Sequence, residues 1–120
     1  MRDYTVALNA EYVVATNADA LECEDIACNA IIAALKGKAE EVETYVVSTY
    51  KRLFVGHTVK VSVNMVVDVE ANSYEMAYDR ATDVIEDMKY DNNITLVGCG
   101  TFDAALTEDR AYLVKPKFAI

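Results

Sequence analysis

Hydrophobic and polar residues alternate along two long stretches of the chain, residues 4–16 and residues 58–71. A period of two is typical of a β-strand that buries one face and exposes the other. The first stretch is predicted to bury Tyr4, Val6, Leu8, Ala10, Tyr12 and Val14 and to expose Thr5, Asn9 and Glu11. The second is predicted to bury Val59, Val61, Val63, Met65, Val67 and Val69 and to expose Thr58, Lys60, Ser62, Asn64, Asp68 and Glu70. Both strands exceed the usual five or six residues, so we expect them to bend or to project past the helices.

A helical period follows each of these strands, in residues 20–38 and in residues 73–91. Apolar residues recur there at spacings of three and four, as on a helix that packs one face against a sheet. Gly37 is expected to stop the first helix, and Ser73 or Asn72 to cap the second. Asp19 and Glu22 are spaced as in a capping box. The predicted buried residues are Ala27, Ala30, Ile31, Ala34 and Leu35 in the first helix, and Met76, Ala77, Ala81, Val84, Ile85 and Met88 in the second.

Further extended segments follow the two helices, "TYVVSTYKRLFV" at residues 44–55 and "NITLVGCGTF" at residues 93–102. The resulting order β-α-β-β-α-β predicts an α+β fold of the split βαβ, or ferredoxin-like, kind, with one antiparallel sheet and both helices on one face. Its halves, residues 1–56 and 57–120, read as a duplicated β-α-β unit within a single domain, joined by a hairpin at "FVGHTV". The segment "AYLVKPKFAI", residues 111–120, is expected to add a C-terminal edge strand, because Pro116 lacks the amide hydrogen of a central ladder.

The charge balance narrows the classes of partner. Twenty acidic and eleven basic side chains give a net charge of −9 over 120 residues, which disfavours direct contact with nucleic acid or with an anionic membrane surface. The longest purely apolar run is short, "AIIAAL". The chain runs directly into a strand pattern, and its three cysteines form no CxxC pair. We therefore expect a cytoplasmic protein, in the host cytoplasm if its source is a virus.

A row of carboxylates along the second predicted helix is the main candidate site. Glu75, Asp79, Asp83, Asp87 and Asp91 fall on one four-residue step, although like charges at that spacing repel by about 0.2 to 0.5 kcal/mol per pair. Glu86 broadens the row, and Tyr78 adds an amphipathic ring of a kind common at interfaces. The alternative interpretation is a helix face that contacts only solvent, which would have the same composition. The predicted partner-binding residues are Glu75, Tyr78, Asp79, Asp83, Glu86, Asp87 and Asp91.

The sequence offers no comparable signal for catalysis, cofactors or metals. Cys99 stands between two glycines, but nothing in the spacing brings His57, the only histidine, beside it as an activating base. No glycine-rich phosphate loop or calcium-binding loop is present. Carboxylates fixed on one straight helix diverge, which disfavours a divalent metal. We therefore expect a protein that is not an enzyme.

The expected function is that of a small acidic binding protein that docks onto the basic surface of another protein. One concrete form is a phage or mobile-element inhibitor of a host defence complex that binds nucleic acid. Mimicry of DNA would need Glu22, Glu24 and Asp25, or Glu40, Glu41 and Glu43, to join the row in space. The first alternative is a structural or assembly subunit whose strands 4–16 and 58–71 build a homodimer or larger homo-oligomer. The second is a small-ligand sensor with a ferredoxin-like fold.

Overall fold

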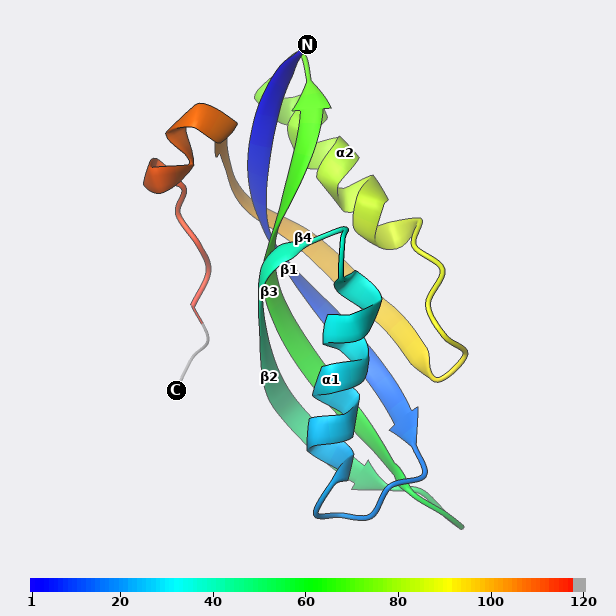
Figure 1. Ribbon diagram of the computed structural model, residues 1–120. Helices are drawn as coiled ribbons and strands as arrows, with labels where there is room; N and C mark the ends of the chain where they lie inside the picture. The colour runs from blue at the N-terminus through cyan, green and yellow to red at the C-terminus, as the bar shows by residue number, and fades with distance from the viewer. Residues whose placement is uncertain (118–120) are drawn as a thin grey trace.

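The computed structural model describes residues 1–117 of the chain and shows one four-stranded antiparallel sheet with two helices (Figure 1). A 3₁₀ helix, η1, follows the last strand. The elements along the chain are β1 (Arg2–Thr16), α1 (Cys23–Leu35), β2 (Glu40–Lys51), β3 (His57–Ala71), α2 (Tyr74–Glu86), β4 (Ile94–Leu106) and η1 (Thr107–Tyr112). The fold is therefore α+β, as the alternating patterns predicted.

The two stretches of strict alternation form the centre of the sheet. The strand order is β2-β3-β1-β4, and β1 pairs with β3 in one unbroken register from Arg2 opposite Ala71 to Thr16 opposite His57. The predicted inward residues of both strands are buried, apart from the half-buried Val69. Because β1 and β3 are both interior, most of their length is paired within the sheet, and only residues 67–71 of β3 extend past the last β2 pair, Glu40 opposite Val66. Assembly of subunits through strands 4–16 and 58–71 stays a prediction. The free edges belong to β2 and β4.

Both helices cover the same face of the sheet, one after the other along its length (Figure 1). A strand of 15 residues extends about 50 Å, whereas a helix of 13 residues rises only about 20 Å. One helix therefore covers less than half of the long strands. Helix α2 packs over β4, β3 and β1, and α1 packs over β2, β3 and β1 at the other end.

Helix α1 begins at Cys23, later than its pattern predicted. The side chain of Asp19 accepts hydrogen bonds from the backbone N–H groups of Leu21 and Glu22, at 3.0 and 3.1 Å. The Asp19 half of the predicted capping box is therefore present, but it stabilises a turn before the helix, whose N-cap is Glu22. The stop signal is confirmed: α1 ends at Leu35, and Gly37 follows with φ +83°.

Helix α2 starts as predicted and ends early. The Ser73 hydroxyl accepts a hydrogen bond from the N–H of Met76 at 3.1 Å, a cap of the expected kind. The helix ends at Glu86, not Asp91. The Tyr90 hydroxyl donates to the carbonyl of Ile85 at 2.9 Å, so a side chain bonds to a carbonyl of the last turn.

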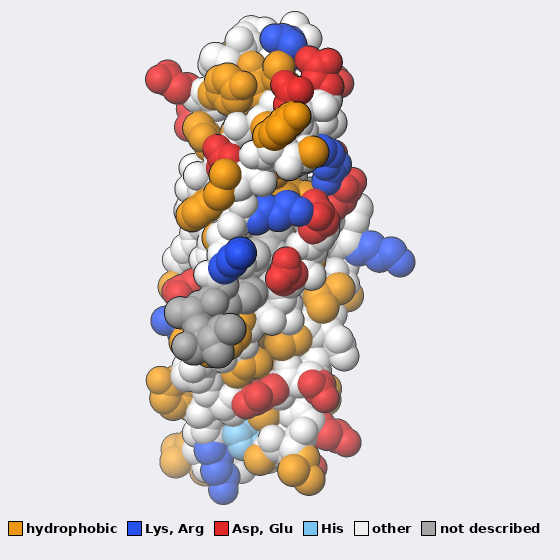
Figure 2. All heavy atoms as spheres, turned by 90° about the vertical axis from the view of Figure 1, so that its left-hand side faces the viewer, with side chains coloured by type: hydrophobic (Ala, Val, Ile, Leu, Met, Phe, Trp, Pro, Cys, Tyr) orange, Lys and Arg blue, Asp and Glu red, His pale blue; other side chains and the backbone are white. Residues whose placement is uncertain are grey.

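The C-terminal segment, residues 107–117, lies against the sheet face that has no helix (Figures 1 and 2). The Asn64 side chain donates to the carbonyl of Pro116 at 3.0 Å, and the N–H of Val114 donates to Asp103 Oδ2 at 2.8 Å. Arg110 and Lys115 both form ion pairs with Glu41. Thr5 and Asn64, which the alternation predicted to be exposed, are therefore buried.

The expected C-terminal edge strand is absent from the described residues. Residues 107–112 form η1, and residues 113–117 have no regular structure. The remainder of that predicted strand, residues 118–120, lies outside the described residues. The contacts made by Arg110, Val114 and Lys115 direct the segment across the sheet face rather than along an edge.

Replacing Gly56 should destabilise the protein more than replacing Gly37. A Cβ atom at Gly56 would lie 1.9 Å from the carbonyl oxygen of Thr16, whereas one at Gly37 would meet nothing within 4 Å. Both have φ near +80° and so pay the same backbone cost. We expect Gly56→Ala to cost roughly 3 kcal/mol and Gly37→Ala about 1 kcal/mol in denaturant unfolding. Equal losses would contradict the close packing of this hairpin on the end of β1.

Acid should loosen the C-terminal segment. The hydrogen bond from Lys115 and then that from Arg110 lower the pKa of Glu41. A carboxylate with a lowered folded-state pKa stabilises the attachment above its ordinary pKa, and that stabilisation is lost as the pH falls through the lowered value. Protection of the Asn64 side-chain amide from hydrogen exchange should therefore fall below about pH 4. Glu41→Gln should reduce this protection already at pH 6; unchanged protection would show that the ion pairs do not hold the segment.

Candidate functional site

The outer side of α2 exposes four carboxylates, Glu75, Asp79, Asp83 and Glu86, which we call the acidic face. The helix is held to the sheet by Ala77, Ala81 and Ile85, which are buried. Because successive members of Glu75, Asp79 and Asp83 are four residues apart, they rise about 6 Å each along the helix axis. The structure therefore presents three of the predicted residues as one straight row.

The other predicted residues are placed differently. Asp87 is the C-cap of α2, and Asp91 lies in the loop before β4, where its carbonyl accepts a hydrogen bond from Ile94. Both are exposed, but Asp91 does not continue the helical row. Tyr78 is half-buried against the core, so part of its ring remains accessible beside the row.

The carboxylates of the acidic face form no ion pair and no side-chain hydrogen bond within residues 1–117. The ion pairs of this part of the chain join other acids, namely Glu11, Glu40, Glu41 and Glu108, to cations of the sheet and of the C-terminal segment. Arg80, on α2 itself, donates to the backbone carbonyl of Glu70 at 2.7 Å. Arg80 therefore forms no ion pair with the row.

The other acidic clusters do not extend the row. Glu22, Glu24 and Asp25 lie at the start of α1, which is the end of that helix remote from α2 (Figure 1). Glu40 and Glu41 are paired with Arg110 and Lys115. The acidic face is therefore a short patch, about 12 Å from Glu75 to Asp83.

A groove between the C-terminal ends of the two helices bounds the acidic face. It has a volume of about 480 Å³ and is lined by Ala34, Lys36, Lys38, Val84, Asp87, Met88 and Lys89. Lys36, Lys38 and Lys89 thus line the same groove as Asp87. The charge is mixed there, whereas Glu75, Asp79 and Asp83 lie outside this groove.

Tyr90 and Tyr12 connect the end of α2 to the core. Their hydroxyl oxygens are 2.8 Å apart, and their rings pack edge to face with centroids 5.3 Å apart. Burial, followed by the hydrogen bond to Tyr90, raises the pKa of Tyr12 far above its ordinary value. Both hydroxyls stay protonated at neutral pH, which suits them for a structural link.

Cys99 and His57 are not brought together. Cys99 lies opposite Ala10 in the middle of β4, whereas His57 lies opposite Thr16 at the start of β3, with its Nδ1 3.0 Å from the carbonyl oxygen of Ala18. Burial, with a smaller effect of Glu86, raises the pKa of Cys99 to about 11. A thiol with this pKa is a poor nucleophile at neutral pH.

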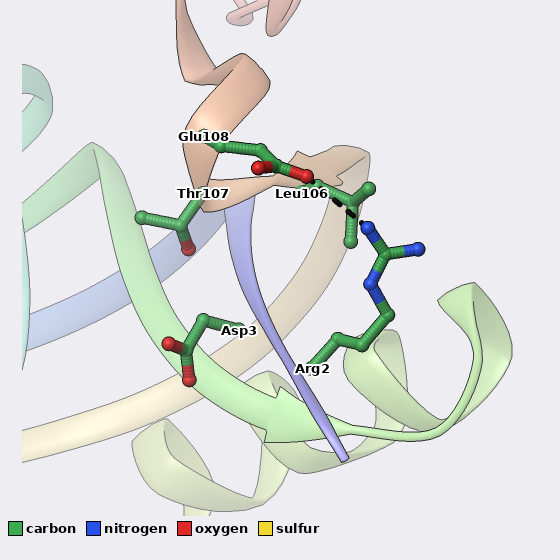
Figure 3. A pocket seen from close by; sticks show the side chains of 5 residues that line it. All are labelled: Arg2, Asp3, Leu106, Thr107 and Glu108. Atoms are coloured by element: carbon green, nitrogen blue, oxygen red, sulfur yellow. Dashed lines mark hydrogen bonds and ion pairs between the residues drawn. The ribbon is translucent and has the colours of Figure 1, made fainter.

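A shallow crevice lies where β1 begins and β4 ends (Figure 3). Its volume is about 370 Å³, and its lining residues are Arg2, Asp3, Leu106, Thr107 and Glu108. Arg2 spans it to reach Glu108 at 3.1 Å, and both side chains are largely exposed. The crevice is therefore bridged by a solvent-exposed ion pair, and such pairs usually contribute little to the free energy of unfolding.

An exposed apolar turn joins β2 to β3, and it begins earlier than the hairpin predicted at "FVGHTV". Leu53 and Phe54 are 87% and 90% exposed, and Val55 is 58% exposed. The run "RLFV" was expected to be part of a strand that ends in a hairpin. Only the end of β2 at Lys51 shows that these side chains lie beyond the sheet.

Comparison with protein-family models, with curated proteins and with solved structures found no match for this chain. Within residues 1–117, no helix has the length and apolar character needed to cross a membrane. No group of three or more His, Cys, Asp or Glu side chains in the same range is arranged to hold a metal ion. Function is therefore inferred from surface geometry and charge.

Cys99 should react slowly with alkylating reagents in the folded protein. At pH 8 its thiolate fraction should be about a hundredth or less of that of an ordinary thiol with a pKa of about 8.5. We expect its alkylation, followed by mass spectrometry, to accelerate toward pH 11 and to become fast in denaturant. Rapid labelling of folded Cys99 at pH 7 would contradict the buried environment and would reopen a catalytic role.

Proposed function

We propose that this chain is a non-enzymatic binding protein that docks through the acidic face of α2 onto a positively charged segment of another protein. The observation that carries the proposal is the row of unpaired carboxylates Glu75, Asp79 and Asp83 on a helix whose opposite side is buried in the core. Charged groups fixed on a packed helix need little reorganisation on binding. They also steer a partner of opposite charge during encounter.

The length of the row favours a short basic segment as the docked element. Duplex DNA carries one charge per about 1.7 Å, whereas α2 offers one per about 6 Å over three residues. An inhibitor of viral or mobile-element origin that fills a nucleic-acid groove would need more carboxylates on one side. A lysine- or arginine-rich strand or helix end of a host protein matches the row better.

The fold proposed for this function is the ferredoxin-like split βαβ. The element order β1-α1-β2-β3-α2-β4 and the strand order β2-β3-β1-β4 both agree with that architecture and with a duplicated β-α-β unit. This fold hosts many unrelated functions. In this fold the sheet is a rigid platform that holds α2, and the fold itself adds no catalytic or ligand-binding group.

Neutralising the row tests the proposal. The immobilised chain captures proteins from a lysate of candidate host cells, and the captured partner is identified and purified. Its affinity is then measured for the wild type and for a variant carrying Glu75→Gln, Asp79→Asn and Asp83→Asn. We expect the variant to bind about tenfold more weakly or worse. Binding of the wild type should also weaken between about 0.1 M and about 1 M salt, where the Debye length falls from about 10 Å to about 3 Å.

A control variant separates the position of the charges from their number. Glu22→Gln, Asp25→Asn and Asp109→Asn remove the same three charges from exposed positions elsewhere. This variant should bind the partner as the wild type does. Equal loss in both variants, or full binding by the α2 variant, would refute docking through the acidic face.

A further inference from the structure

The outer edge of β4 is a second surface, and the proposed function leaves it unassigned. Strand β4 ends the sheet on the side that α2 covers, so one side of its backbone has no partner strand among residues 1–117 (Figure 1). Proteins usually protect such an edge with charged residues or proline, because its unpaired N–H and C=O groups accept a further strand. Asp103 is the only charged residue of β4, and its carboxylate already accepts a hydrogen bond from the N–H of Val114. The edge therefore has little chemical protection against pairing.

Two β-bulges limit the length of this edge that is open to pairing. The register of β4 against β1 shifts at Val97 and again at Phe102, and bulges hinder the addition of a strand. Between the bulges, residues 98–101 pair with β1 without a shift. These residues are the open part of the edge, which we call the β4 window.

Backbone groups in the β4 window point alternately to β1 and to the free side. The N–H of Ala15 in β1 donates to the carbonyl of the residue that precedes β4, at 2.9 Å. Odd-numbered residues of β1 therefore direct their backbone groups toward β4, because successive residues of a strand point to opposite sides. Their partners in the window are Gly98 and Gly100. The N–H and C=O groups of Cys99 and Thr101 consequently point to the free side.

The two faces of the β4 window differ. A side chain at Gly98 or Gly100 would point to the helix-free face of the sheet, where its Cβ atom would meet nothing within 4 Å. Cys99 lies on the other face, because its partner Ala10 is buried beneath the helices. Burial and, to a smaller extent, the carboxylate of Glu86 raise the pKa of Cys99 to about 11. A strand added at this edge would therefore meet open space on one face and the last carboxylate of α2 on the other.

We propose that the basic segment bound by this chain is an extended strand that pairs with the β4 window beside the acidic face. This inference rests on the proposed function and adds the conformation and the pattern of the segment. Its basic residues alternate with apolar ones, so the basic side chains share a face with Glu86 and the apolar ones cover the glycines. In peptide binding at sheet edges, backbone hydrogen bonds give affinity and alternate side chains give specificity. Alternate residues of a strand are about 6.6 Å apart, which nearly matches the spacing of about 6 Å in the acidic row.

A second copy of this chain is a poorer occupant of the same edge. Helix α2 packs over β4, so two paired β4 edges would place both α2 helices on one face of the joined sheet. The carboxylates of the two acidic faces would then repel each other. Charge complementarity therefore favours a basic strand over a β4–β4 dimer.

Hydrogen exchange at single amides tests the pairing. The probe is a blocked peptide of about six residues in which lysine and valine alternate. With the peptide at saturation, the amides of Cys99 and Thr101 should exchange about tenfold more slowly or slower still. Those of Gly98 and Gly100, which already face β1, should change little. The proposal would be overturned if bound peptide left Cys99 and Thr101 unchanged, or if a dimer of the free protein already protected them.

Methylated peptides separate strand pairing from attraction between charges. Opposed residues of paired strands share a face, so the lysines of the probe, opposite Cys99 and Thr101, direct their N–H groups to β4. Methylation of the lysine backbone nitrogens should weaken binding about tenfold or more, because hydrogen bonds to the edge are lost. Methylation of the valine nitrogens is the matched control and should leave the affinity unchanged, since these groups point away from β4.

Titration calorimetry with the two methylated peptides distinguishes this inference from the proposed function. Equal affinities would refute strand addition and leave docking through the acidic face intact. The proposed function fails separately, if the variant with Glu75→Gln, Asp79→Asn and Asp83→Asn binds the captured partner as the wild type does. No binding of the unmethylated peptide would also refute strand addition.

Discussion

The antiparallel pairing of β1 with β3 is the constraint on which the rest of the molecule depends. Its register runs without a break over 15 residues, so every second side chain of both strands reaches the same face. That face is a continuous layer of valine, leucine and tyrosine about 50 Å long, far too long for one 13-residue helix. Two helices must therefore follow one another along it. This arrangement places α2, with the acidic face, over the β4 edge and α1 over the β2 edge of the same face of the sheet.

Much of the fold was predictable, because the periodicities report burial on one face. Alternation identified the inward residues of β1 and β3, and the spacing of Ala77, Ala81 and Ile85 identified the buried side of α2. The failures come from contacts between distant parts of the chain. Asn64 is buried because Pro116 covers it, and α2 ends at Glu86 while Tyr90 folds back to Ile85 and Tyr12. No local pattern encodes such pairs.

The candidate site was predictable in composition and only partly in extent. The four-residue step correctly placed Glu75, Asp79 and Asp83 on one exposed row, since helical geometry fixes their spacing. The step could not show that the helix stops before Asp91, nor that Lys36 and Lys38, which follow α1, line the same groove as Asp87. The hairpin between β2 and β3 lies at residues 52–56 rather than at the predicted 54–59, because an apolar run reads as a strand until the position of its partner strand is known.

The central claim is that the acidic face, and not the apolar turn, contacts a basic partner protein. Hydrogen exchange with mass spectrometry, performed on the chain alone and with the captured partner, tests it most directly. The account predicts that added protection falls on peptides covering Tyr74–Glu86, while peptides covering residues 52–56 change little. Protection confined to residues 52–56, with α2 unchanged, would contradict it.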